Sequence, residues 1–81
     1  MSKYTPLRDH LSSLKLETVV IEFCAIEKIL GDALPASARR HRAWWANEKV
    51  GSHTQSVAWL DAGFGVDSVD FGRSRVTFKK L

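Results

Sequence analysis

The chain has 81 residues, 44% of them hydrophobic, and a formal net charge of +3 from 12 Lys and Arg against 9 Asp and Glu. This length predicts a single domain over residues 1–81 and excludes a large multi-layer enzyme fold. The single cysteine, Cys24, excludes an internal disulfide framework and a CxxC zinc site. No apolar run approaches the roughly 20 residues that cross a bilayer, and the charged first residues lack a signal core. We therefore expect a soluble cytoplasmic domain.

The first half of the chain predicts a helix, a short strand and a second helix. Thr5-Pro6 is typical of a helix start, because Thr caps free amides and Pro fits the first turn. Leucines at helical spacing continue this helix over residues 6–14. The β-branched run 17–21 is too short for a helix and predicts a strand. Apolar residues at helical spacing then indicate a helix over 23–30, which Gly31 ends.

The second half predicts two more helices and a hairpin. No Gly or Pro interrupts residues 36–46, which predicts a third helix. Ser52 and Gln55 match the capping box of a fourth helix over 53–62, which Gly63 ends. Apolar and polar residues alternate on both sides of Gly72-Arg73-Ser74, which predicts a hairpin of strands 66–71 and 75–79.

This order of elements predicts an α+β, winged helix-turn-helix-like domain of three to four helices, one short strand and a C-terminal β-hairpin. In such a domain the helix before the hairpin, here 53–62, is the recognition helix, and the turn 72–74 is the wing. We expect strand 17–21 to pair with the hairpin. Val19 and Ile21 would then face the same core as the apolar residues of the hairpin.

Four motifs resemble a family of short bacterial proteins and modules. They are Leu34-Pro35-x-Ser37-Ala38, Trp44-Trp45-x-Asn47, His53-x-Gln55 and Trp59-Leu60-x-Ala62-Gly63, and the resemblance covers roughly residues 4–79. Glu22 and Phe64 depart from the pattern, since Thr or Ser and Trp are usual at these positions. The resemblance implies a compact bacterial module and assigns no catalytic residue.

The distribution of charge favours a nucleic-acid partner. Residues 35–49 carry +3 and residues 73–81 carry +4, whereas the segments before each sum to −1 and −3. Basic side chains neutralise phosphates, so the sequence predicts that double-stranded DNA is bound by Arg39, Arg40, Arg42, Arg73, Arg75 and Lys79. On a continuous helix, Arg39 and Arg42 would share a face.

The start of the expected recognition helix carries side chains that are able to read base edges. These residues are His53, Thr54, Gln55 and Ser56. A second interpretation uses the same helix differently: a pocket for a flipped or modified base would be lined by Trp44, Asn47, His53, Gln55 and Trp59. The amides of Asn47 and Gln55 also fit a purely structural role as helix caps and loop ties.

The tryptophan pair supports a third interpretation. Successive helical residues point about 100° apart, so we expect Trp45 in the core with Ala38 and Trp44 partly exposed. Trp and Arg are enriched in interface hot spots. An exposed Trp44 beside the arginines therefore predicts a protein-binding module, such as a small phage or bacterial inhibitor or adaptor with an acidic partner protein.

The sequence predicts neither a catalytic nor a metal site. The histidines and Cys24 match no zinc-ligand spacing, so we expect no metal and no other cofactor. Cys24 lies in an apolar helix, which is typical of a small core residue. We therefore expect a binding protein and not an enzyme.

Overall fold

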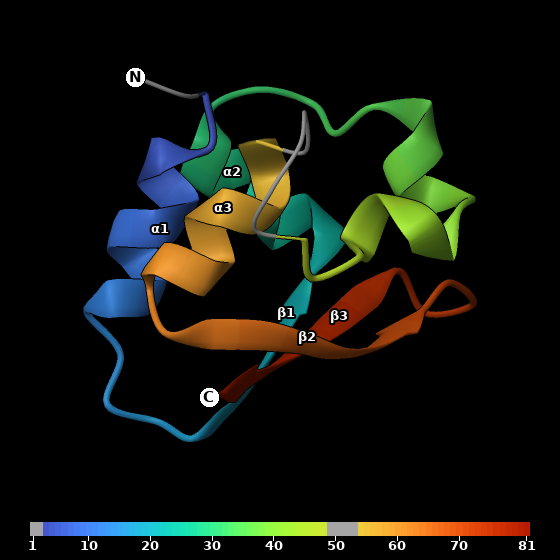
Figure 1. Cartoon of the computed structure of the whole chain (residues 1–81). Helices are drawn as coiled ribbons and strands as arrows, with labels where there is room; N and C mark the ends of the chain where they lie inside the picture. Colours follow the sequence, from blue (N-terminus) through green and yellow to red (C-terminus); the bar gives the residue numbers. More distant parts are fainter. Residues whose placement is uncertain (1–2, 49–53) are drawn as a thin grey trace.

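In the computed structural model, which describes residues 3–48 and 54–81, the chain folds as an α+β domain with an antiparallel sheet (Figure 1). The helices are α1 (Thr5–Ser12), α2 (Phe23–Leu30) and α3 (Thr54–Asp61), and the strands are β1 (Thr18–Glu22), β2 (Phe64–Asp70) and β3 (Arg75–Lys80). Two short 3₁₀ helices, η1 (Ala36–Arg39) and η2 (Arg42–Trp45), lie between α2 and α3. The order confirms the expected winged-helix-like arrangement.

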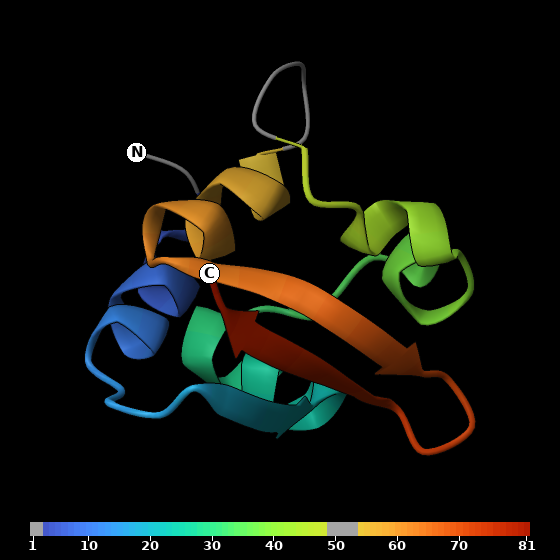
Figure 2. The ribbon, with the colours of Figure 1, turned by 60° about the horizontal axis from the view of Figure 1, so that its bottom comes forward.

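The sheet is built around its last strand. The strand order is β1-β3-β2, with both neighbours antiparallel to β3. Val19 pairs with Phe78 and Ile21 with Val76, so these side chains face one core, as the alternation predicts. The helices cover one face of the sheet and leave the other to solvent (Figures 1 and 2).

The core is organised around stacked aromatic rings. Trp45 has no exposed surface and stacks between Phe23 and Trp59, with ring centroids 5.4 and 5.7 Å away. Its Nε1 donates a hydrogen bond to the Ala38 carbonyl at 2.8 Å. Trp44 packs at the edge of this cluster and is partly exposed. The expected division of the tryptophan pair is confirmed.

Two glycines end helices as the sequence predicts. Gly31 follows α2 with φ 72°, and Gly63 follows α3 with φ 86°. Both lie in the left-handed region, which side chains with a Cβ rarely adopt. The stops fix where β2 begins and how the chain leaves α2.

The continuous helix expected over 36–46 is wrong. Helical geometry is lost after Arg39, because His41 is extended with φ −118° and ψ 119°. A continuous α-helix would commit the Ala38 carbonyl to the N–H of Arg42. The break leaves this carbonyl for the Trp45 indole and lets the ring reach the core. Arg39 and Arg42 therefore do not share a helix face.

No helix within residues 3–48 and 54–81 has the length and apolar character that crossing a membrane requires.

The position of Cys24 differs from the expected one. Its side chain is exposed and its Sγ lies 3.7 Å from a carboxylate oxygen of Glu22. Phe23 and Ile26 occupy the core face of α2 instead, so Cys24 is not a core residue.

Candidate nucleic-acid interface

Two of the side chains expected to read DNA bases, Gln55 and Ser56, lie inside the fold. Gln55 is 8% exposed and donates its Nε2 to the Trp44 carbonyl at 3.1 Å. Ser56 has no exposed surface and donates its hydroxyl to the Glu48 carbonyl. Gln55 thus holds η2 against α3, and Ser56 holds the segment after η2, so this packing takes both side chains away from any ligand. The expectation that they read bases is not supported by this placement.

The outer face of α3 has a different character. Val57 and Asp61 are exposed and lie four residues apart, on one face of the helix. Neither side chain is a donor suited to base edges. His53 and the side chain of Thr54 lie outside the described residues. Among the described side chains of α3, exposure therefore favours no base-reading residue.

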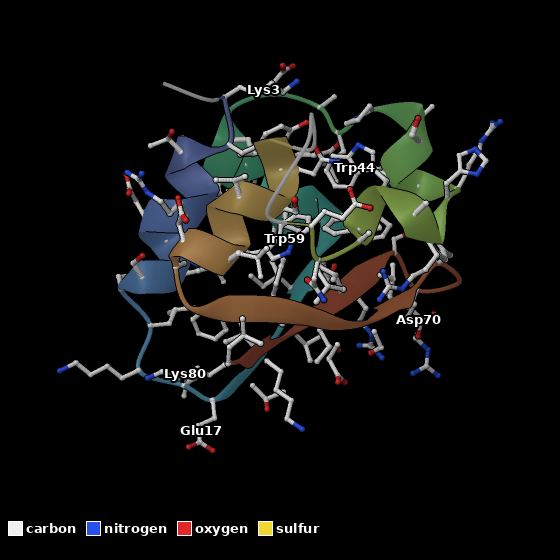
Figure 3. The ribbon with its side chains drawn as sticks, in the orientation of Figure 1. Lys3, Glu17, Trp44, Trp59, Asp70 and Lys80 are labelled. Carbon is white, nitrogen blue, oxygen red and sulfur yellow. The ribbon has the colours of Figure 1, made fainter. Side chains whose placement is uncertain are left out.

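The expected base pocket is a packed cluster in the structure. Figure 3 shows Trp59 near the middle of the molecule and Trp44 beside the 3₁₀ helices. Trp59 has no exposed surface and offers no face to a stacked base. Asn47 Oδ1 accepts hydrogen bonds from Trp59 Nε1 at 3.0 Å and from the Val66 amide at 2.8 Å, and its Nδ2 donates to the Val66 carbonyl at 3.0 Å. The two amides, Asn47 and Gln55, thus serve as loop ties.

The hairpin tip and the 3₁₀ helices meet at one end of the molecule. Phe23 contacts both segments. Its ring centroid lies 5.6 Å from the guanidinium carbon of Arg39 and 6.4 Å from the ring centroid of Phe71. Its amide also donates to the Ser74 carbonyl at 2.8 Å. Figures 1 and 2 show η1, η2 and the β2–β3 turn at the same end. We call this region the basic end and define it by Arg39, Arg40, Arg42, Arg73 and Arg75.

Carboxylates neutralise part of the basic end. Arg39 forms an ion pair with Glu27, with 2.8 Å between the nitrogen and oxygen atoms. Arg75 faces Glu22 on β1 and Asp70 on β2 in the register of the sheet. Arg40, Arg42 and Arg73 are exposed and form no ion pair within the part of the chain that the structure describes. These three arginines are the strongest candidates for phosphate contacts.

Lys79 does not belong to the basic end. It pairs with Thr18 and Gly65 near the opposite end of β3. It lies four positions after Arg75 along the strand, a span of about 13 Å. Figure 3 shows the same separation for labelled neighbours, with Asp70 beside the hairpin tip and Lys80 at the far end of the sheet. The two basic segments of the sequence therefore merge only in part.

Glu27 fixes the position of η1, a role that the sequence patterns did not assign. One oxygen accepts the Leu34 amide at 2.8 Å and the other pairs with Arg39. The hydrogen bond from Leu34, followed by that from Arg39, holds the pKa of Glu27 below its usual value. A carboxylate in the last turn of a helix interacts unfavourably with the helix dipole. The position of Glu27 in the sequence therefore indicated that its carboxylate needs hydrogen-bond or ion-pair partners.

Other chemistry has little support among the described side chains. Residues 3–48 and 54–81 contain no group of three or more His, Cys, Asp or Glu side chains placed to hold a metal ion. The candidate surface is therefore built from exposed arginines around Phe23.

Residues 4–81 match the model of a family described as a domain of unknown function (DUF7662), and the chain belongs to this family. The match covers all four motifs and confirms the family resemblance. No curated protein and no solved structure matches the chain. A function for this chain must therefore be argued from its own surface.

Proposed function

We propose that this member of the DUF7662 family is a nucleic-acid-binding module that contacts the phosphate backbone of double-stranded DNA through its basic end. The observation that carries the proposal is that the segment with Arg40 and Arg42 and the hairpin turn with Arg73 lie at one end of the domain, linked by the contacts of Phe23 with Arg39, Phe71 and Ser74. Arginines on such a surface neutralise phosphates and release counterions. The hairpin tip stands where a winged-helix domain has its wing.

The burial of Gln55 and Ser56 on α3 determines which kind of DNA binding we expect. Gln55 donates to a carbonyl of η2 and Ser56 to a carbonyl of the segment after η2, so the described part of this helix has no exposed base-reading donor. Phosphate contacts position a protein on a duplex without reading its sequence. We therefore expect affinity that varies little among duplexes and falls steeply with salt.

The test removes the three arginines together. We expect Arg40→Ala/Arg42→Ala/Arg73→Ala to weaken binding of a labelled duplex in anisotropy titrations at several salt concentrations. The slope of log affinity against log salt should become shallower by about 2.7, since each lost phosphate contact contributes about 0.9. All three side chains are exposed, so the fold should persist.

The matched control removes the same charge from other exposed sites. Lys15→Ala/Lys79→Ala/Lys80→Ala leaves the basic end intact. This variant should keep most of the salt slope of the natural chain. An equal loss in both variants would show that net charge, and not the basic end, attracts DNA. No binding of the natural chain at low salt would overturn the proposal.

An acidic partner protein is the second candidate. It is favoured by η2, which holds both Arg42 and the partly exposed ring of Trp44. Such an interface has an apolar centre, so its affinity would depend much less on salt than phosphate binding does. Trp44→Ala would weaken this interaction and leave DNA binding unchanged.

A further inference from the structure

An apolar groove runs along β1, which is an edge strand of the sheet. The groove measures about 510 Å³, and its apolar lining comes from the segment between α1 and β1, from β1 and from α2: Leu14, Leu16, Val19, Val20, Ile21, Ala25 and Ile29. Val20 is 56% exposed and Leu16 is 55% exposed. Exposed apolar side chains beside an open edge are a common mark of strand pairing.

Hydrogen bonds show which backbone groups of β1 point outward. At one flank the Lys80 amide donates to the Glu17 carbonyl at 2.7 Å, and at the other the Phe23 amide donates to the Ser74 carbonyl at 2.8 Å. Residues of an antiparallel strand alternate between its two edges. Residues 19 and 21 therefore also bond to β3. The N–H and C=O groups of residues 18, 20 and 22 point to the open edge.

The opposite edge of the sheet is blocked at Val66. On β2 the N–H and the C=O of Val66 both bond to the side chain of Asn47, at 2.8 and 3.0 Å. A β-bulge between Val66 and Ser68 and the exposed carboxylate of Asp67 interrupt the same edge. A further strand therefore has its place at β1.

We propose that β1 pairs antiparallel with β1 of a second copy of this chain, across a two-fold axis at Val20. In this register Val20 faces Val20 of the second copy, and Thr18 faces its Glu22. Each outward N–H then meets an outward C=O, and all three outward residues of each strand are used. The product is one continuous sheet with the helices of both copies on the same face.

The charges of β1 fit this register. Glu22 of the second copy would face the hydroxyl of Thr18. Thr18 is itself paired with Lys79 on β3, so the ammonium group of Lys79 lies one strand farther from Glu22. The two Glu22 side chains stay four residues apart, about 13 Å along the strands. A shift of the axis to Ile21 would halve that separation and leave one outward pair unused. Like charges therefore disfavour an axis at Ile21, and the use of all three outward residues favours the axis at Val20.

The groove supports the same pairing on the helix side. Val19 and Ile21 line the groove and would lie opposite Ile21 and Val19 of the second copy. The two grooves then meet across the axis and remove exposed apolar surface, including that of Leu16, from water. A second copy offers the apolar surface that this groove requires, in the position that the backbone bonds dictate.

The test is the oligomeric state of the full chain without DNA, so its result is independent of the proposed function. We expect a concentration-dependent dimer in sedimentation experiments between about 1 µM and 1 mM, the range of modest affinities. Val20→Lys would place two ammonium-bearing side chains opposite each other at the axis, with Cα atoms about 5.5 Å apart. We expect it to weaken the dimer at least about ten-fold.

Val57→Lys is the matched control, since it makes the same change at an exposed valine on α3. It should leave the dimer unchanged, and circular dichroism checks that both variants fold. In a Cys24→Ser background, Val20→Cys should form a disulfide-linked dimer on oxidation, because the expected Cα separation suits a disulfide, whereas Val57→Cys should not. A chain that stays monomeric throughout, or a dimer that Val20→Lys leaves intact, would overturn the proposal. In the monomeric case the edge would serve a strand of another protein.

Discussion

At the scale of single residues, the two adjacent tryptophans have different roles. Trp45 has no exposed surface, stacks on Phe23 and Trp59, and donates its indole N–H to Ala38. Removing a buried large aromatic side chain costs about 3–5 kcal/mol. We expect Trp45→Ala to lose this much free energy of unfolding, and Trp44→Ala to lose distinctly less because its ring is partly exposed. Urea denaturation of both variants measures this, and equal losses would contradict the division of roles.

The burial of Trp45 was predictable from the chain, whereas the bonds of Asn47 were not. Adjacent helical positions point in different directions, so one tryptophan had to leave the core. Nothing local to Asn47 indicates that its amide reaches Val66, nineteen residues later, and the indole of Trp59. Such hydrogen bonds depend on how distant segments pack, and a local sequence pattern does not indicate that packing.

At the scale of elements, local signals decided which predictions were right. The helix over 23–30 and the C-terminal hairpin carry their own stops and alternation, and both are confirmed. The helix over 36–46 has no internal breaker, yet it is wrong, because the core position of Trp45 outweighs local propensity. The burial of Gln55 has the same origin, since its partner is a carbonyl of η2.

Glu27 gives the element scale its own prediction, because it ties α2 to the chain before η1 and to η1 itself. Its pKa in the folded chain is below the usual value of 4.5. A carboxyl of this kind stabilises the fold above its unfolded pKa, and the stabilisation is lost as pH falls through the folded pKa. We expect the stability difference between the natural chain and Glu27→Gln to be constant from pH 6 to 8 and to shrink below about pH 4.5.

Denaturation across this pH range measures the effect. Asp67→Asn is the control, since it alters an exposed carboxylate on β2. A difference between the natural chain and Glu27→Gln that does not change with pH would show that shape, and not charge, accounts for the role of Glu27.

At the scale of the whole molecule, the basic end was only partly predictable. The sequence shows two basic segments, but their meeting depends on Phe23, which lies in neither. The exclusion of Lys79 follows from hairpin geometry, since residues four positions apart along a strand are separated by about 13 Å. Composition therefore favours the proposed kind of ligand, and only the fold indicates that the two arginine-bearing segments lie at one end of the domain.

The two edges of the sheet give a prediction for the molecule as a whole. The amide of Val66 donates to Asn47, whereas that of Val20 points outward in a single copy. We expect hydrogen exchange measured by NMR to be slow at Val66 and fast at Val20 in dilute solution. Raising the concentration should slow exchange at Val20, and at Thr18 and Glu22 beside it, because pairing protects the outward amides, and it should leave Val66 unchanged. Protection of Val20 at every dilution would contradict the assignment of the open edge.

The closure of β2 by one side chain also sets the size that an assembly can reach. A sheet with two open edges can polymerise without limit, and this is how edge strands give rise to fibres. Here the side-chain amide of Asn47 blocks the β2 edge, since it bonds the N–H and C=O of Val66 with which an incoming strand would pair. Growth through β1 therefore stops once two copies have met, and the species formed is finite. The amide that ties a loop within one copy is thus also a safeguard against aggregation.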